Sequence, residues 1–369
     1  MRTIMAPDAA RLYTEHSAIV SLYLGLDDVP NPWRTEQRWH ALRTSLAADD
    51  ATVTDLVALD DVVADAAAQP GDRVLAAFCA GGQPLVVRHL EHSSVADCAS
   101  AGPLPLGGPL ISWSQQRLVY LVVTTDRTGA DITAYRWQDE VVETVHVEGS
   151  NDEIERNAPG GWAQLRYQHR AEDSWRHNAE EVAAAVTTMA DYLDPELILV
   201  TGDVRAVQLL QHALPERFEP VVQRLASLGT RGADGSAAVK AAEIAQHLQT
   251  AIVGARQKAL AHWSDEHGQE GLASSGADAT AAALREGRLA TLFVAYDLAN
   301  RRNGWCGSEP NQVAAEAHEL AECGIAGHPA PLADALIRAA YATGADVLVI
   351  DETDPGCPAD GVAGLLRFA

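Results

Sequence analysis

The chain has 369 residues, of which 47% are hydrophobic and 21% are charged, and its formal net charge is −24. This length is sufficient for two or three domains with buried cores. The acidic balance excludes broad, non-specific binding to nucleic acid, because such binding needs a large cationic surface and the release of counterions. A local basic site on an acidic body remains compatible with this composition.

The cysteine pattern and the first residues of the chain both favour the cytoplasm as the compartment. The cysteines are odd in number, widely spaced and without a CxxC pair: Cys79, Cys98, Cys306, Cys323 and Cys357. This pattern is typical of a reducing cytoplasm. Cys306 and Cys323, with His318 and His328, lack the paired spacing of zinc ligands, so we expect no metal site. The start shows no signal-peptide pattern, and no apolar run is long enough to span a bilayer, so we predict a cytoplasmic protein without a membrane partner.

The first part of the chain, residues 1–112, has the pattern of an α/β domain. A strand is predicted at 18–24, helices at 34–46 and 53–68, and strands at 73–79 and 85–90. Gly81 and Gly82 separate the last two strands, which predicts a β-hairpin turn. The segment 101–109 is rich in glycine and proline, and we interpret it as a linker.

The second part, residues 116–265, combines strands with long helices. The predicted elements are strands at 117–124, 130–137, 141–147 and 197–200, and helices at 171–193 and 237–262. A loop is expected at 227–236. Asp126 and Asp131 could suggest a two-metal nuclease site, but we interpret both as turn residues, a common role for aspartate.

The third part, residues 275–369, alternates helix and strand. The predicted elements are helices at 279–286 and 331–342 and strands at 290–295, 346–351 and 361–368. We therefore predict an α/β protein of three domains.

The segment 160–170, GGWAQLRYQHR, carries the most distinctive pattern in the chain. Gly160 and Gly161 permit backbone conformations closed to other residues and a close approach to another molecule. If a helix starts near Gln164, then Arg166 and Arg170 lie one turn apart on one face. From Arg156 to Arg170 there are three arginines and a histidine but no acidic residue. These features fit a docking loop that holds phosphates, or else a flexible turn followed by a solvated helix start.

This segment resembles the GGQ loop of archaeo-eukaryotic class I release factors, in which GGQ is followed by three residues, Arg-Phe/Tyr and further basic residues. Gly160, Gly161, Arg166 and Tyr167 match in register, but Trp162 occupies the position of the glutamine. The continuation AEDSWRHNAEEVAAAV resembles the bacterial, actinobacterial branch of this superfamily, the release-factor-like and Pelota-like proteins that include the Balon-type ribosome hibernation factors. The literal GGQ at 81–83 is not equivalent, because proline follows it and no basic run does.

The resemblance covers residues from about 115 to 369 and implies a fold and a role. The middle domain would be ribonuclease-H-like. The patterns LREGRLATLFVA, GADVLVID and GVAGLLRF resemble a C-terminal α/β/α domain of the L7Ae type. The family implies binding to the ribosomal A site, with rRNA and tRNA as contacts, in hibernation or rescue. A translational GTPase such as elongation factor Tu is the implied protein partner.

The loop predicts docking without hydrolysis. In the family, the glutamine helps a water molecule to reach the peptidyl-tRNA ester. The Trp162 side chain has one N–H donor and no carbonyl acceptor, but it can stack on a base. Together with the absence of P-loop, G-x-S-x-G and H-E-x-x-H motifs, this predicts a non-enzyme without a catalytic residue or cofactor. The predicted RNA-binding residues are Arg156, Gly160, Gly161, Trp162, Arg166, Tyr167, His169 and Arg170.

Two alternatives remain open at this point. The first is a peptidyl-tRNA hydrolase or tRNA nuclease that uses Gln164 or His169 in place of the lost glutamine. Turnover of peptidyl-tRNA would identify it. The second is a scaffold that acts away from the ribosome, and failure to co-migrate with ribosomes would identify that one.

Overall fold

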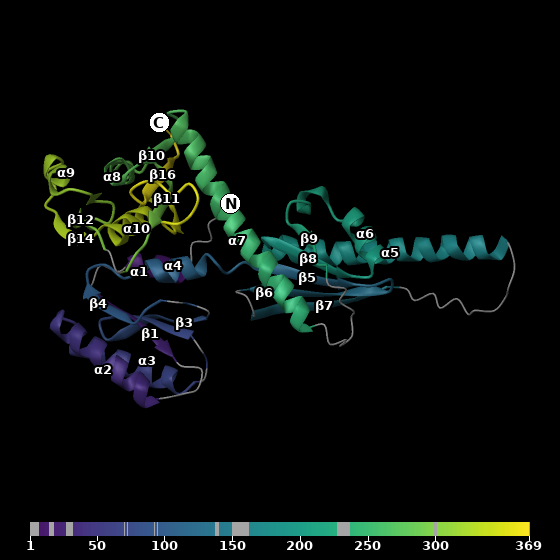
Figure 1. The fold of residues 1–369 in the computed structure, drawn as a ribbon, viewed down its shortest axis with the longest axis horizontal. Helices are drawn as coiled ribbons and strands as arrows, with labels where there is room; N and C mark the ends of the chain where they lie inside the picture. The colour runs from purple at the N-terminus through teal and green to yellow at the C-terminus, as the bar shows by residue number, and fades with distance from the viewer. Residues whose placement is uncertain are drawn as a thin grey trace. The chain divides into compact units, whose positions relative to one another are not determined.

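The computed structural model describes residues 7–14, 18–26, 32–69, 71, 73–91, 93, 95–136, 140–149, 162–226, 237–298 and 301–368. These segments form several sheets with flanking helices, which confirms the predicted mixed α/β class (Figure 1). Contacts divide the chain into two compact units. The first unit comprises Met1–Gln115 and Ala255–Ala369, and the second comprises Gln116–Gly254. The division into three domains stays a prediction.

The N-terminal part of the first unit contains an antiparallel sheet with the order β3-β2-β1-β4. Its strands are β1 (Ile19–Leu26), β2 (Arg73–Ala80), β3 (Gln83–Glu91) and β4 (Cys98–Gly102). Its helices are α1 (Pro7–Thr14), α2 (Pro32–Ala48), α3 (Val53–Ala67) and α4 (Gly108–Ser114). The alternation of side chains along β1 places Leu22 and Leu24 against α2 and α3, while Tyr23 faces the core that contains α1 and α4.

Two details of this part bear on the sequence predictions. Gly81 and Gly82 have φ values of 60° and 76°, and Gln83 pairs with Ala80, so the literal GGQ is the predicted hairpin turn. The linker predicted at 101–109 is wrong. This stretch ends β4 and begins α4, and its Leu104 and Leu106 are buried in the core. Gly107 and Gly108 serve here for close packing rather than for flexibility, because a Cβ at either position would overlap a tyrosine side chain.

The C-terminal part of the first unit contains a sheet with the order β10-β16-β11-β15. Its strands are β10 (Ala273–Ser275), β11 (Leu289–Ala295), β15 (Asp346–Ile350) and β16 (Val362–Leu366). One face packs on α8 (Ala277–Arg285) and α10 (Leu332–Thr343), and the other packs on the last turns of α7 (Ala237–Gly268) through Leu260 and Trp263. This is the expected α/β/α layering. A small second sheet, unforeseen from the sequence, contains β12 (Asn303–Cys306), β13 (Val313–Ala314) and β14 (His328–Pro331), beside α9 (Ala317–Glu322).

One hydrophobic core joins the two parts of the first unit. It runs from Phe78 on β2, past α1 and α4, to Leu336 on α10. Figure 1 shows α1 and α4 between the first sheet and α10. The rings of Tyr13 and Tyr341 stack with centroids 5.3 Å apart, and the Gln115 amide donates to the Val347 carbonyl at 2.6 Å. These contacts hold segments from opposite ends of the chain together.

The second unit contains a five-stranded mixed sheet with the order β7-β6-β5-β8-β9. The strands are β5 (Val119–Thr125), β6 (Gly129–Arg136), β7 (Glu140–Glu148), β8 (Leu197–Gly202) and β9 (Val222–Arg224). Strand β6 is antiparallel to both of its neighbours, whereas β5, β8 and β9 run parallel. In chain order this sheet is 3-2-1-4-5, the arrangement expected of a ribonuclease-H-like domain.

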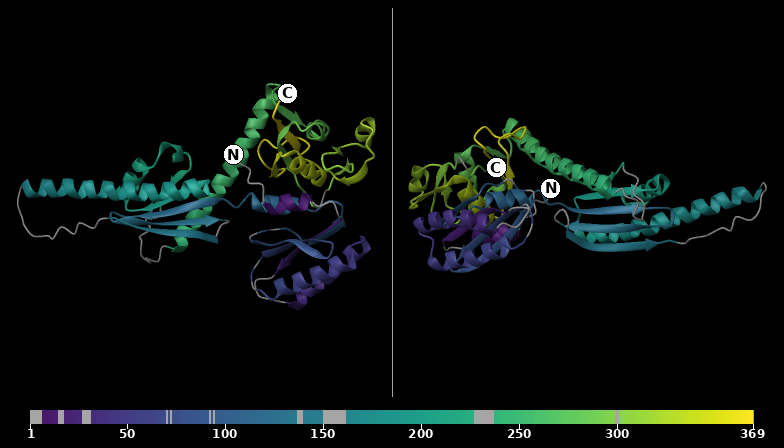
Figure 2. Two further views of the ribbon diagram at one scale, coloured as in Figure 1. Left: turned by 180° about the vertical axis from the view of Figure 1, so that it is seen from behind. Right: turned by 60° about the horizontal axis from the view of Figure 1, so that its bottom comes forward.

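Helices cover both faces of this second sheet. One face packs on α5 (Trp162–Leu193) and α6 (Val204–Ala213), through residues such as Val186 on α5 and Val207 on α6. A short 3-10 turn, η1 (Glu216–Phe218), follows α6 and adds Phe218 to this core. The other face packs on the first part of α7 through Leu248. Figure 2 shows that α5 continues at its N-terminal end beyond the edge of the strands.

Candidate functional site

Helix α5 begins at Trp162, directly after the paired glycines. The sequence predicted a start near Gln164, two residues later. Arg166, Tyr167, His169 and Arg170 therefore lie on the first turns of α5. Arg156, Gly160 and Gly161 lie outside the described residues.

The start of α5 has a basic character that follows from sequence and helix geometry. Positions 162, 166 and 170 are four residues apart in an α-helix and so share a face. The first turn contains no acidic residue. The unpaired N–H groups of a first helical turn carry a partial positive charge, and Arg166 and Arg170 follow in the sequence.

Three side chains meet where α5 passes the carboxyl ends of β5 and β8. The guanidinium of Arg127, on the turn between β5 and β6, lies 4.6 Å from the centroid of the Trp175 ring. The guanidinium of Arg205, in the first turn of α6, lies 5.7 Å from the same ring. Arg127 also pairs with Asp203 at 3.4 Å, and Asp203 caps α6 by accepting from the backbone N–H of Arg205 at 2.9 Å. We call Arg127, Trp175 and Arg205 the base cluster, in the sense of a structural base that supports α5.

The turn that carries Arg127 is itself fixed. Asp126 accepts from the backbone N–H groups of Thr128 and Gly129 at 2.8 and 3.0 Å, an Asx turn that confirms the predicted turn role of this aspartate. Asn178 of α5, buried, donates its side-chain N–H to the Arg127 carbonyl at 2.9 Å. Both the backbone and the side chain of Arg127 thus contact α5.

Among the residues that the structure describes, the remaining polar candidates form isolated pairs. Asp131 lies on β6 rather than in the turn, and its carboxylate is 2.9 Å from Nδ1 of His146. Cys306 and His328, considered together in the sequence, come within 3.2 Å of each other, and burial raises the pKa of the Cys306 thiol. In the described segments no three His, Cys, Asp or Glu side chains are grouped so that they could hold a metal ion.

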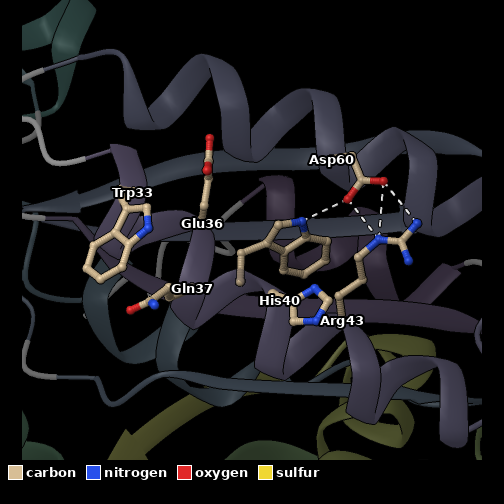
Figure 3. A pocket seen from close by; sticks show the side chains of 7 residues that line it. Trp33, Glu36, Gln37, His40, Arg43 and Asp60 are labelled. Atoms are coloured by element: carbon tan, nitrogen blue, oxygen red, sulfur yellow. Dashed lines mark hydrogen bonds and ion pairs between the residues drawn. The ribbon is translucent and has the colours of Figure 1, made fainter.

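A shallow groove of about 710 Å³ lies over α2 and α3 in the first unit (Figure 3). Asp60 accepts from Trp39 Nε1 at 2.8 Å and from Arg43 Nε at 2.9 Å, so its carboxylate is occupied and it raises the pKa of Arg43. Trp33, at the other end, is 67% exposed. The contacts of Asp60 with Trp39 and Arg43 hold α2 and α3 together at this groove. Among the residues that line it, no nucleophile has a neighbouring general base.

Sequence reasoning missed the base cluster. In the sequence, Trp175 is one apolar position within the helix predicted at 171–193. Arg127 and Arg205 are isolated arginines in the sequence, and no local pattern indicates that both approach the same ring. The one available signal was their position directly after two neighbouring strands, at the edge where loops of α/β sheets gather.

The fold and the helix start define a class, an α/β protein with a ribonuclease-H-like unit whose long helix begins with a basic segment. The model of "Bacterial archaeo-eukaryotic release factor family 2" matches residues 119–269, which include this unit. The uncharacterised protein Rv2629 of Mycobacterium tuberculosis is 31% identical over 342 residues, covering 91% of this chain and 89% of the relative, and MT2704 from another strain gives the same values. The chain belongs to the bacterial archaeo-eukaryotic release factor family.

Solved structures give more distant similarities. Pelota from Archaeoglobus fulgidus is 12% identical, with a TM-score of 0.36, and the match covers 98% of this chain and 92% of that one. Dom34 of S. cerevisiae, described as a translation termination-like factor, is 9% identical with a TM-score of 0.38, over 84% of this chain and 78% of that one. The family assignment rests on the family model and the mycobacterial relative. In the part of the chain that the structure describes, every helix is too short or too polar to cross a membrane.

Proposed function

We propose that this protein binds the ribosomal A site and acts in hibernation or rescue without hydrolysing peptidyl-tRNA. Membership of a release-factor family supports a role in translation. The start of α5 carries the rest of the proposal. A helix that begins at Trp162 directly after two glycines, with arginines at 166 and 170 and no acidic residue in its first turn, suits a close approach to RNA.

The residue at the start of the helix argues against ester hydrolysis. A glutamine amide can both donate to and accept from a water molecule, whereas the Trp162 indole can only donate. An indole can instead stack on a nucleotide, an interaction worth about 1–3 kcal/mol per base. The loop would thus retain its docking function and lack the group that orients water.

The acidic character of the chain would orient the protein as it approaches RNA. A net charge of −24 repels RNA from most of the surface, so a basic helix start is the preferred point of contact. The partners proposed are rRNA and tRNA at this helix start. A translational GTPase such as elongation factor Tu is proposed for the C-terminal part.

Co-sedimentation of the purified full chain with ribosomes tests the proposal. Vacant ribosomes should bind the protein, and ribosomes with tRNA bound in the A site should not. Binding should weaken as salt rises from about 50 to 200 mM, since phosphate contacts release counterions. Absence from the ribosomal pellet at low salt would favour the alternative, a scaffold that acts elsewhere. Equal binding to both kinds of ribosome would refute the A-site assignment.

The GTPase partner needs a separate measurement. Elongation factor Tu in its GTP and GDP forms should be added to the sedimentation assay. Enhanced recovery of the protein with one nucleotide form would support the partnership. Equal recovery with both forms and without the factor would exclude it.

A further inference from the structure

Helix α5 is supported along only part of its length. It has 32 residues, which corresponds to about 48 Å at 1.5 Å per residue. Among its residues with described side chains, the buried ones begin at Asn178 and continue to Ala190. Figures 1 and 2 agree that the N-terminal turns continue beyond the edge of the strands. Trp175, half-buried, lies three residues before Asn178, the first of these buried residues.

A helix held at one end amplifies small rotations at its support. Trp162 precedes Trp175 by 13 residues (175 − 162), which is about 20 Å along the helix. A tilt of about 10° at Trp175 would displace Trp162 by about 3 Å, on the same helical rise. A displacement of that size exceeds the tolerance of a directed phosphate contact, because hydrogen bonds weaken over a few tenths of an ångström.

The base cluster has the contacts needed to prevent such a tilt. Arg127 and Arg205 approach the Trp175 ring from two different elements, the β5–β6 turn and α6. Cation–π contacts favour one placement of the ring, and Trp is the strongest aromatic partner. Asn178, one turn further along α5, ties the Arg127 carbonyl to the same helix at 2.9 Å. Two contacts one turn apart constrain the direction of α5 as well as its position.

The cluster is packed too closely to bind a ligand. The cavity beneath it, which Trp175, Arg127 and Ala206 help to line, has a volume of about 10 Å³. This is roughly the space for one water molecule. The cluster therefore acts as a packed support.

We propose that Trp175, held by Arg127 and Arg205, is the positioning residue that sets the direction of α5 and thereby the place of its first turns, residues 162–170. The consequence of this positioning role for ribosome binding rests on the proposed function above. The support itself belongs to the second unit alone and can be tested without a ribosome.

The test compares Trp175→Ala with Trp175→Phe in the full chain by amide hydrogen exchange and mass spectrometry. In the alanine variant, exchange at residues 162–174 should rise about tenfold, because local opening is no longer opposed at the base of the helix. Exchange at residues 182–190, in the packed part of α5, should stay unchanged. The phenylalanine variant, which keeps an aromatic face for the two guanidiniums, should remain near the wild type.

Two further variants make the test decisive. Tyr192→Ala removes an aromatic residue that is 81% exposed on the same helix and should change neither segment. The double variant Arg127→Ala, Arg205→Ala should reproduce the local effect of Trp175→Ala, and it replaces that variant if the latter does not fold. Unchanged exchange at 162–174 in the alanine and double variants would overturn the proposal, and so would an equal rise along all of α5.

A ribosome pelleting assay separates this proposal from the proposed function. Trp175→Ala should weaken binding about tenfold and Trp175→Phe should restore it, as expected for loss of alignment. If the wild-type protein does not bind ribosomes, the proposed function fails while the exchange result still decides the positioning role. If wild-type binding is strong and Trp175→Ala leaves it unchanged, the positioning role is refuted.

Discussion

The hydroxyl of Tyr296 donates a hydrogen bond of 2.8 Å to the carboxylate of Asp334, which is 1% exposed. The backbone N–H of Gly107 also donates to this carboxylate, and Arg301 lies 3.9 Å from it. Asp334 thus connects α10 with the start of α4, segments from the two ends of the chain. Burial raises the pKa of Asp334 to about 7, although the bond from Tyr296 and the charge of Arg301 oppose this shift.

The stability of the first unit should depend on the ionisation of Asp334. Because its folded pKa of about 7 lies above the usual value of 3.8, the folded state retains the proton over a range in which the unfolded chain has released it. The contribution to stability is therefore complete below pH 4 and is lost as the pH rises to 7. The free energy of unfolding of the wild type, minus that of Asp334→Asn, should fall between about pH 4 and 7. Urea unfolding at several pH values measures this difference, and a constant difference would contradict the assignment.

The close approach around Asp334 gives a second prediction. A Cβ at Gly108 would overlap the ring of Tyr296, and one at Gly107 would overlap the hydroxyl of Tyr13. Gly107→Ala and Gly108→Ala should each destabilise the first unit by about 1–3 kcal/mol, the usual cost of overpacking. Gly102→Ala is the matched control, because a Cβ there meets nothing within 4 Å. Equal midpoints for all three variants in urea would show that the contact between α4 and the C-terminal part is loose.

The elements with clear periodicity were predictable. The apolar run of β5, the period-two pattern of β7 and the helical spacing of Val182, Val186 and Met189 each reflect a local physical rule, and the structure has a strand or helix at each place. The mixed α/β class follows from the order of those elements.

Other elements depend on distant partners. Strand β4 is short and glycine-containing, and it becomes a strand because its pairing with β1 satisfies its backbone groups. For the same reason, the segment 101–109 was misinterpreted: Leu106 is buried because its N–H reaches Ser21, far away in the sequence. The candidate site follows the same distinction. The basic helix start is visible in the sequence, whereas the convergence of Arg127 and Arg205 on Trp175 requires the fold.

The purified protein should not release peptide from peptidyl-tRNA on the ribosome. The physical reason is that Trp162 offers no acceptor to orient a water molecule, and that Gln164 lies half a turn further along α5. The measurement is the rate of release of a labelled peptide, with a class I release factor as the positive control. A rate clearly above background that Gln164→Ala abolishes would establish the hydrolase alternative. A rate that His169→Ala abolishes would instead assign the chemistry to the histidine.

Charge reversal at the start of α5 should weaken ribosome binding. Arg166→Glu and Arg170→Glu each replace a cation that is proposed to contact a phosphate. Each lost contact should lower the slope of log affinity against log salt by about one, and the double variant by about two. Arg285 is the matched control, because it is engaged within the first unit with the Val313 carbonyl at 2.6 Å and with Glu319. Arg285→Gln should leave the slope unchanged, even if it lowers stability. If Arg166→Glu and Arg170→Glu bind like the wild type at every salt concentration, both arginines are solvated helix-start residues and the docking assignment is wrong.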